Sequence, residues 1–359
     1  MYDSIRSLLF RLDPEQAHEL TLRAIRLAGR VRPVGWLLSQ IFKAPDKPVE
    51  VFGLRFRNPV GLAAGYDKDG VAIHGLDTLG FGHIEIGTVT PLPQSGNPKP
   101  RVFRLVEDEA VINRMGFPSR GTEFMQTQLD PDLRVGFVER TFGFRPRFYV
   151  AYRRPTAAVL GVNLGKNKST PNEEAVYDYV SLLQNYSRLA GYLTINVSSP
   201  NTVGLRQLQG RDALESLLTH LHEQRLLEET RWEKRLPLLV KLAPDLTSQE
   251  LDDALDAILN THMDGVIVTN TTLAREGLRS SQGGESGGLS GAPLRVRSEE
   301  VLAQVVKRLD GRLPVVSVGG IMHPDDAKRR LDMGAALVQV YTGLIYRGPG
   351  LVKEIVKSL

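Results

Sequence analysis

The stretch YLTINVSS, residues 192–199, is a continuous run of largely apolar residues that ends in two serines. Apolarity that does not alternate indicates a strand buried on both faces, as in a parallel sheet. Similar runs recur from about residue 58 onward, most of them ending in Gly, Asn, Thr or Ser. They are NPVGLAAG (58–65), HIEIGTV (83–89), AVLGVNLG (158–165), PLLVKLAP (237–244), GVIVTNTT (265–272), PVVSVGG (314–320) and LVQVYTG (337–343).

Eight such units predict an α/β fold, a (β/α)₈ barrel over residues 43–359, with a small helical extension at residues 1–42. Between the runs, SQELDDALDAILNTH (248–262) and PDDAKRRLDMG (324–334) are predicted helices, and the second ends at Gly334. A doubly wound sheet is the alternative. The first strand's GLAAGYDKDG lacks the G-x-G-x-x-G turn that would favour that fold.

The composition excludes several kinds of chemistry. The chain has no cysteine, which excludes disulfides, thiolate nucleophiles, iron–sulfur clusters and cysteine-bound zinc. Its seven histidines are scattered, and His220 and His222 point to different faces of a predicted helix, so no metal site is expected. The net charge is +4, and the sequence contains no block of five like charges. A nucleic-acid partner therefore has little support. No run approaches the roughly 18 apolar residues of a membrane span, and no signal peptide is expected.

Residues 1–42 precede the repeated units and predict a pair of amphipathic helices. The second helix has Asp13 as its N-cap and Pro14 at its first position, and it is expected to end at Gly29. The first carries four apolar residues on one face, namely Ile5, Leu8, Leu9 and Leu12. The arginine-rich polar side leaves two interpretations open, a cap packed on the barrel or an interfacial membrane element.

Residues 128–156 also stand apart from the repeat, because they are rich in arginine and aromatic residues. One interpretation is a hairpin or extra helix on the outside of the barrel. The other is a contact with lipid headgroups.

Polar residues at the ends of the predicted strands indicate one functional site, because the carboxyl ends of barrel strands meet at one face. They include Lys68, Asn163, Asn196, Lys241 and Asn270. The glycines of SVGGI (317–321) and VYTG (340–343) end the last two strands, where barrels often bind phosphate, and so predict a phosphate-bearing ligand. By itself, the serine pair 198–199 favours a polar turn, since no histidine and no G-x-S-x-G motif accompanies it.

Eleven motifs occur in the order seen in one enzyme family. They are GLAAGYDKDG, EIGTVTP, PRVFRL, NRMGFPS, GVNLGKNK, NVSSPNTVGLRQLQ, VKLAPDL, VTNTT, GGLSG, VGGI and YTG. Across residues 1–126 and 157–359 the chain resembles the dihydroorotate dehydrogenases, in particular their membrane-associated, quinone-reducing class. Tyr66 departs from the commoner leucine and Val203 from the usual proline, and residues 128–156 look longer than the family pattern by on the order of twenty residues.

The resemblance implies oxidation of (S)-dihydroorotate to orotate in pyrimidine biosynthesis. FMN would accept the hydride, and ubiquinone or menaquinone would be the terminal electron acceptor. Ser199 would be the catalytic base that removes a proton from C5 while a hydride passes from C6 to N5 of FMN. Because a hydroxyl is a poor base at neutral pH, Ser199 would need a relay through Thr202 or an ordered water. Ser198 would be structural.

The resemblance also implies the site residues. Those for FMN are Ala64, Gly65, Tyr66, Asp67, Lys68, Thr88, Asn163, Asn196, Lys241, Thr269, Gly291, Gly320, Tyr341 and Thr342. Those for the substrate are Lys68, Asn113, Arg114, Met115, Gly116, Phe117, Asn196, Asn201, Asn270 and Thr271. Those for the quinone entrance are His18, Arg104 and Tyr341. Lys241 would stabilise the reduced, anionic flavin, and Lys68 would pair with the substrate carboxylate.

A monomeric, peripheral membrane protein on the cytoplasmic side of the inner membrane of a bacterium is expected, attached through its N-terminal helices. Two alternatives are an FMN barrel acting on another heterocycle and a non-catalytic, membrane-associated flavin-binding protein. The substrate motif NRMGF (113–117) argues against the first. The presence of Ser199, Lys68 and Lys241 argues against the second.

Overall fold

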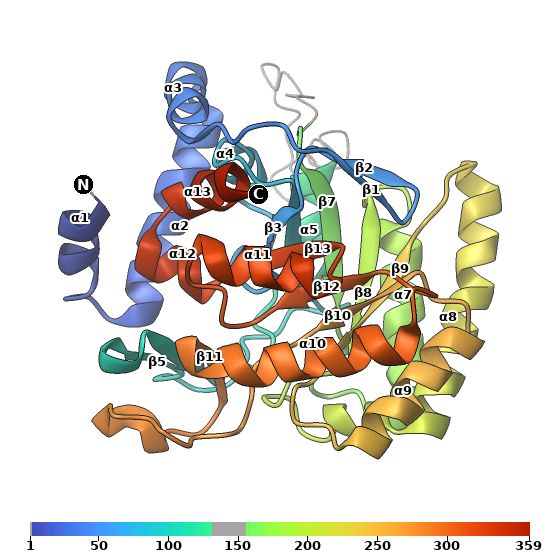
Figure 1. The fold of residues 1–359 in the computed structure, drawn as a ribbon. Coiled ribbons are helices and arrows are strands. Elements are labelled where there is room, and N and C mark those ends of the chain that lie inside the picture. The colour runs from blue at the N-terminus through green and yellow to red at the C-terminus, as the bar shows by residue number, and fades with distance from the viewer. Residues whose placement is uncertain (1, 131–155) are drawn as a thin grey trace.

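The computed structural model describes residues 2–130 and 156–359, and a closed barrel of eight parallel strands forms its centre (Figure 1). Around the barrel the strands are β3 (Val60–Leu62), β4 (His83–Val89), β7 (Val159–Leu164), β8 (Tyr192–Asn196), β9 (Leu238–Leu242), β10 (Gly265–Val268), β12 (Val315–Val318) and β13 (Leu337–Val340). Each strand lies within one of the eight apolar runs, so the predicted (β/α)₈ barrel is confirmed.

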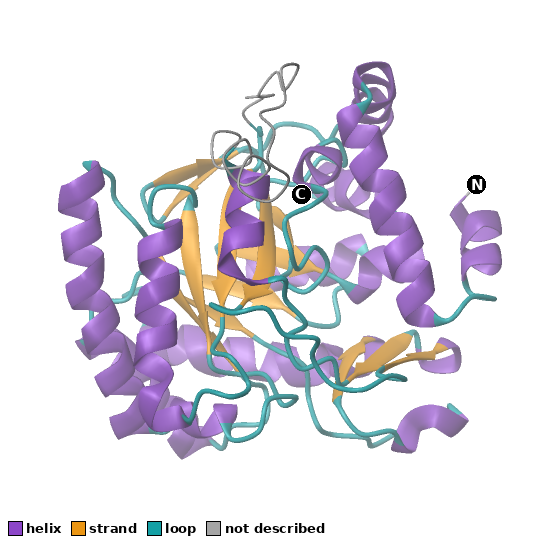
Figure 2. Ribbon diagram, turned by 180° about the vertical axis from the view of Figure 1, so that it is seen from behind, coloured by secondary structure: helices purple, strands orange, loops and turns teal. Residues whose placement is uncertain are grey.

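Helices surround these strands (Figure 2). They are α4 (Ile73–Asp77), α5 (Gly121–Leu129), α7 (Ala175–Tyr186), α8 (Arg211–Trp232), α9 (Ser248–Asn260), α10 (Arg295–Leu309), α11 (Pro324–Asp332), α12 (Thr342–Arg347) and α13 (Gly350–Ser358). The helices predicted at 248–262 and 324–334 are α9 and α11. A capping box between Thr247 and Glu250 begins α9, satisfying backbone N–H groups that have no partner inside the helix.

A hairpin closes the amino-terminal end of the barrel. Its strands are β1 (Val49–Val51) and β2 (Leu54–Phe56), which pair antiparallel. Phe52 and Phe56 are buried and pack with Leu239, Ile267 and Leu337 of the barrel strands. Because apolar side chains fill this end, a ligand cavity is left to the opposite end of the barrel.

A small antiparallel sheet is built from segments inserted between barrel units. It consists of β5 (Val102–Leu105), β6 (Ala110–Asn113) and β11 (Gly288–Gly291), with β6 in the middle. The register pairs Asn113 with Gly288 and Ala110 with Gly291. Asn113 ends β6 and begins the NRMGF motif, so this pairing places that motif next to GGLSG, although about 175 residues separate the two in the sequence.

Three helices, not the predicted pair, form the N-terminal extension: α1 (Tyr2–Leu9), α2 (Pro14–Arg30) and α3 (Arg32–Phe42). The Asp13 carboxylate accepts hydrogen bonds from the first turn of α2, which confirms the predicted cap. The helix ends at Arg30, one residue beyond the predicted end at Gly29. A Cβ on Gly29 would lie 2.4 Å from the backbone nitrogen of Gly75, so this glycine allows α2 to pack closely on α4.

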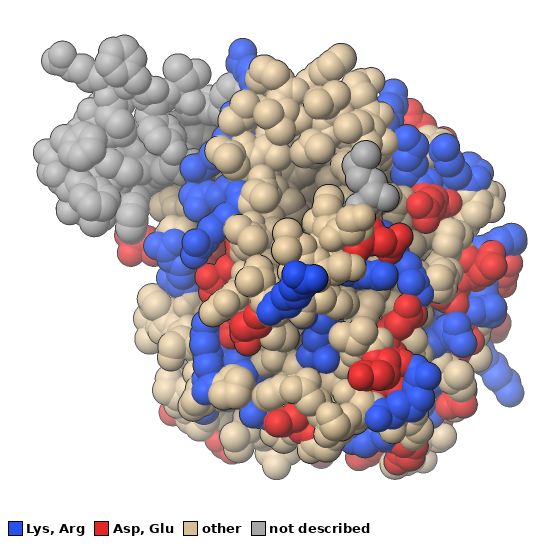
Figure 3. Space-filling view, turned by 90° about the vertical axis from the view of Figure 1, so that its left-hand side faces the viewer, with Lys and Arg blue, Asp and Glu red and all other residues tan. Residues whose placement is uncertain are grey.

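The three helices expose many apolar side chains on the side of the molecule that Figure 3 shows, where a surface without charges is bordered by lysines and arginines. The exposed residues are Ile5, Leu8, Leu20, Leu27, Val34, Trp36, Leu37 and Ile41. Within the described residues, no helix has the length and apolarity needed to cross a membrane. The predictions for residues 128–156 fall almost entirely on residues 131–155, outside the described part of the chain.

Candidate active site

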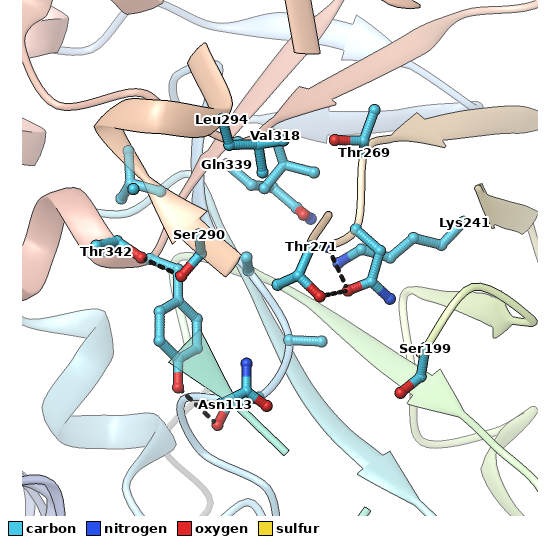
Figure 4. Close-up of a pocket in the computed structure, with 18 of the residues that line it drawn as sticks. Asn113, Ser199, Lys241, Thr269, Thr271, Ser290, Leu294, Val318, Gln339 and Thr342 are labelled. Carbon is cyan, nitrogen blue, oxygen red and sulfur yellow. Dashed lines mark hydrogen bonds between the residues drawn. The ribbon is translucent and has the colours of Figure 1, made fainter. Parts of the chain in front are cut away.

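The carboxyl end of the barrel holds a cavity of about 1020 Å³, measured with the open space at its mouth. Figure 4 shows Ser199 and Lys241 on one side of it and Ser290 and Thr342 on the other. Of the predicted site residues, the cavity is lined by Ala64, Gly65, Lys68, Thr88, Asn113, Met115, Gly116, Phe117, Asn196, Ser199, Asn201, Lys241, Thr269, Asn270, Thr271, Gly291, Gly320, Tyr341 and Thr342. The barrel therefore gathers residues from segments far apart in the sequence into one wall.

Ser199 lies in the loop after β8, with its side chain almost wholly buried. Its hydroxyl oxygen accepts a hydrogen bond of 3.2 Å from the backbone N–H of Asn201. The neighbouring Ser198 instead donates to Asn196 Oδ1 at 3.0 Å and accepts from Asn270 Nδ2 at 2.9 Å, as a structural residue would. The Thr202 hydroxyl is buried and has no hydrogen-bond partner among the described residues.

Side-chain amides form one side of the cavity. Asn201 Nδ2 donates to Asn113 Oδ1 at 3.3 Å, which joins the loop after β8 to strand β6. Asn270 Oδ1 accepts from the backbone N–H of Thr271 at 2.8 Å. Amides offer both donors and acceptors, so this wall suits a planar heterocycle with both kinds of group.

Two lysines make the cavity electropositive. Burial lowers the pKa of Lys68 to about 8, with the nearby charge of Asp69 acting against that shift. The Lys68 ammonium group also donates to the backbone carbonyl of Gly65. Burial lowers the pKa of Lys241 below its ordinary value, while the charge of Glu85 acts in the opposite direction. Both lysines can attract a negatively charged ligand.

Glycines at the far side of the cavity meet the backbone of other segments. Gly291 has a φ of 101°, and a Cβ there would lie 2.3 Å from the carbonyl oxygen of Glu109. Gly320 has a φ of 72°, and its Cβ would lie 2.3 Å from Arg295 Cα. Only glycine fits these positions, and both glycines line the cavity. The Thr342 hydroxyl donates to Ser290 Oγ at 2.8 Å beside them.

Two unpartnered polar atoms test whether these residues fit a flavin. Gln339 Oε1 and Thr269 Oγ1 are buried without a hydrogen-bond partner among the described residues, and both residues line the cavity. Buried polar atoms are normally hydrogen-bonded, so these two point to a polar ligand. A flavin mononucleotide offers ring N–H and carbonyl groups together with a phosphate, and the residues present therefore fit it.

A second cavity, of about 860 Å³, lies between the N-terminal helices and the barrel. His18, Arg104 and Tyr341, the predicted quinone-entrance residues, all line it. Its wall is mostly apolar or aromatic, including Leu9, Phe10, Ala17, Val102, Val111, Leu344 and Ile345. Five residues line both cavities, namely Lys68, Asn113, Met115, Ser290 and Tyr341. The two cavities therefore share part of their walls.

Aromatic rings mark the place where the second cavity approaches the first. The Tyr66 ring stands edge-on to His18, with 5.0 Å between ring centroids, and to Tyr341, with 5.9 Å. Burial, and then the charge of Lys68, lower the pKa of His18 to about 4, so its imidazole is neutral at pH 7. A neutral, aromatic surface suits an apolar ring.

Four of the residues predicted to hold FMN or the substrate do not line the barrel cavity. Tyr66 lines the second cavity instead, and Arg114 pairs with Glu285 at 2.7 Å. The Asp67 carboxylate accepts hydrogen bonds from the backbone of the turn that follows it. Asn163 is buried and is linked to the cavity through the hydrogen bonds that it accepts from Thr88 and Asn196. A direct contact between these four and a ligand stays a prediction.

The sequence reasoning missed two polar residues of the cavity, Ser290 and Gln339. Gln339 is a polar residue inside the apolar run LVQVYTG, and this interruption is a signal that could have identified it as a site residue. Ser290 lies within the GGLSG motif itself. Among the described residues, no group of three His, Asp or Glu side chains is placed to hold a metal ion.

Comparison with known proteins gives concordant results. A family model described as dihydroorotate dehydrogenase matches residues 48–359. The chain is 48% identical, over all of its length and 97% of the other, to the dihydroorotate dehydrogenase (quinone) of Halorhodospira halophila. It is 46% identical to that of Idiomarina loihiensis, with both chains fully covered. The crystal structure of the Eimeria tenella dihydroorotate dehydrogenase in complex with ferulenol has a TM-score of 0.81 at 39% identity, covering 98% of this chain and 93% of that one.

Proposed function

The chain belongs to the dihydroorotate dehydrogenase family, and from this premise we propose that it oxidises dihydroorotate to orotate and passes the electrons to a quinone, a step of pyrimidine biosynthesis. One observation carries this proposal. A polar cavity with a buried serine, amides and two lysines meets a largely apolar cavity beneath the N-terminal helices. Two cavities that share a wall suit a reaction in which a polar substrate and an apolar acceptor never meet.

The substrate would be held by the amide wall and by Lys68. The asparagines 113, 196, 201 and 270 offer hydrogen bonds to the pyrimidine ring, and the positive charge of Lys68 suits its carboxylate. Arg114 supports this wall from outside through its pair with Glu285.

Ser199 would act as the base that removes the proton from C5 of the substrate. Its burial excludes bulk water, and the hydrogen bond from Asn201 would stabilise the negative charge that the oxygen gains as its own proton moves to a relay. The Thr202 hydroxyl, which has no partner among the described residues, supports a relay that receives the proton.

We propose that the flavin is FMN. Bound FMN would accept the hydride from C6 of the substrate and pass the electrons on to the quinone. Gly291, Gly320 and Thr342 would hold its phosphate, because all three line this side of the cavity and glycine lets a backbone approach an anion closely. Lys241, Thr88, Asn196 and Thr269 would surround its ring system.

The quinone would occupy the second cavity, with its ring near His18, Arg104 and Tyr341. The exposed apolar side chains of residues 1–42, with lysines and arginines around them, support attachment of this segment to an anionic membrane surface. Peripheral attachment as a monomer on the cytoplasmic side, and the choice between ubiquinone and menaquinone, stay predictions.

The decisive experiment is an anaerobic titration. Dihydroorotate is added to the purified protein and the visible flavin absorbance is followed. We expect prompt bleaching that a ubiquinone analogue reverses and fumarate does not. A yellow protein that dihydroorotate does not bleach would contradict the substrate and favour a flavin barrel acting on another heterocycle.

A further inference from the structure

A buried carboxylate in the barrel interior is not accounted for by the proposed reaction. Glu85, on β4, has no solvent exposure. It accepts hydrogen bonds from Asn163 Nδ2 at 2.8 Å, Gln339 Nε2 at 2.8 Å and the Tyr192 hydroxyl at 3.2 Å. These donors come from three other strands, β7, β13 and β8. A buried carboxylate with three donors is held in one orientation.

This arrangement fixes the orientation of two amides, because an ionised carboxylate can only accept hydrogen bonds. Asn163 and Gln339 therefore turn their NH₂ groups toward Glu85 and their carbonyl oxygens away from it. Asn163 Oδ1 accepts from Thr88 Oγ1 at 2.6 Å and Asn196 Nδ2 at 3.0 Å, both cavity residues. Gln339 Oε1 is left without a partner among the described residues, and Figure 4 shows the amide end of Gln339 directed toward the middle of the pocket.

Glu85 also lies within electrostatic reach of Lys241, which projects into the barrel interior from β9. The negative charge of Glu85 acts to raise the pKa of Lys241 against the effect of burial. Opposite charges in a low-dielectric interior partly cancel the potential that either one presents to a ligand. The electrostatic potential at the floor of the cavity therefore depends on Glu85 and Lys241 together.

We propose that Glu85 is a positioning residue for the cofactor: it presents the carbonyl of Gln339 to a cofactor N–H group, orders Thr88 and Asn196 through Asn163, and offsets the charge of Lys241. The inference rests on the proposed flavin site. Loss of the carboxylate would free both amides and leave Lys241 without its counter-charge. Oxidised FMN then binds less tightly, and the reduced cofactor, which carries more negative charge, binds better relative to the oxidised form.

The test compares Glu85→Gln with Glu228→Gln in the purified flavoprotein. Glu228 is a matched control, because it is a buried carboxylate on α8 that accepts hydrogen bonds from Ser187 and Trp232, away from both cavities. The midpoint potential of the flavin is measured against a reference dye. We expect Glu85→Gln to favour the reduced over the oxidised cofactor about tenfold, a rise of about 30 mV for a two-electron couple. Glu228→Gln should keep the wild-type potential.

A second variant tests the proposal if Glu85→Gln does not fold. Gln339→Met keeps Glu85 and its charge but removes the unpartnered carbonyl, and should raise the dissociation constant of FMN about tenfold. The inference would be overturned by wild-type FMN affinity in Gln339→Met or by a wild-type flavin potential in a folded Glu85→Gln protein. Either result would leave the proposed function standing. A wild-type protein that purifies without flavin would instead overturn the proposed function and the inference with it.

Discussion

The Glu15 carboxylate of α2 accepts a hydrogen bond of 2.7 Å from the Arg101 guanidinium, and both side chains are about nine-tenths buried. Arg101 also donates to the backbone carbonyls of Ser95 and Asn97, and Asn97 Nδ2 donates to the carbonyl of Asn201, two residues after Ser199. This ion pair therefore connects the helices above the second cavity to the loop that carries the proposed base.

Glu15→Gln should lower the free energy of unfolding by about 3 kcal/mol, because it leaves the buried Arg101 charge without a counter-charge. It should also raise the KM for dihydroorotate, since Arg101 orders the loop of Asn97. Denaturant unfolding and steady-state kinetics measure both effects. Glu19→Gln is the control, because Glu19 is half-exposed and its ion pairs lie at the surface. Equal stabilities of the two variants would contradict the prediction.

Ser199→Ala should slow the reduction of the flavin by dihydroorotate by roughly 10²–10⁴-fold, the usual contribution of a general base. FMN content should not change, because the cofactor is held by other residues. Stopped-flow absorbance measures the rate. Ser199→Cys should recover part of the rate, since a thiol with a pKa of about 8.5 is a better base than a hydroxyl. A near-wild-type rate in Ser199→Ala would mean that another group takes the proton.

Orotate binding should weaken as the pH rises above about 8. Burial lowers the pKa of Lys68 to about 8, so its positive charge is present below that pH and is lost above it. The product carries the same carboxylate as the substrate but needs no base, so its affinity reports the charge of the cavity without that of the base. Titrations from pH 6 to 9.5, followed by flavin absorbance, measure it. Lys68→Met should bind orotate weakly and without this pH dependence, whereas Lys307→Met on α10 should match the wild type.

Ala17→Phe should reduce turnover with a long-chain quinone at least about tenfold and leave flavin reduction by dihydroorotate unchanged. Ala17 is buried and lines the second cavity but not the first, so a larger ring would obstruct only the quinone's space. Leu27→Phe, at an exposed position of the same helix, should have neither effect. Deletion of residues 1–30 should also abolish quinone reduction. That deletion also removes Glu15 and with it the ion pair to Arg101, so it would change stability as well as the quinone cavity. Ala17→Phe is therefore the sharper test.

The protein should lose stability as the pH falls from about 6.5 toward 4. Burial, and then Lys68, lower the pKa of His18 from 6.5 to about 4. The unfolded chain therefore binds a proton in this interval that the folded chain does not, and the stability that is complete above pH 6.5 decreases by on the order of 2 kcal/mol. Chemical denaturation at several pH values measures the decrease. It should be smaller in His18→Phe, and an identical decrease would show that other groups cause it.

The amino-acid sequence by itself determined the barrel and most of the residues that line its cavity. Eight apolar runs can be recognised locally because a strand buried on both faces is apolar without alternation. Their polar ends identified Lys68, Asn196, Lys241 and Asn270, since the carboxyl ends of barrel strands meet at one face. The serine pair was different. Its local pattern favoured a turn, and only the ordered family motifs singled out Ser199.

Only the tertiary structure decided how distant segments meet. Glu85 and Gln339 lie 254 positions apart, and their hydrogen bond exists only because the barrel closes β13 against β3 and β4. The close packing of α2 on α4 depends on Gly29 facing Gly75, and the wall that the two cavities share depends on helices packed against a barrel that follows them in sequence. Periodicity reports which face of a segment is buried, but it contains no information about the partner that buries it.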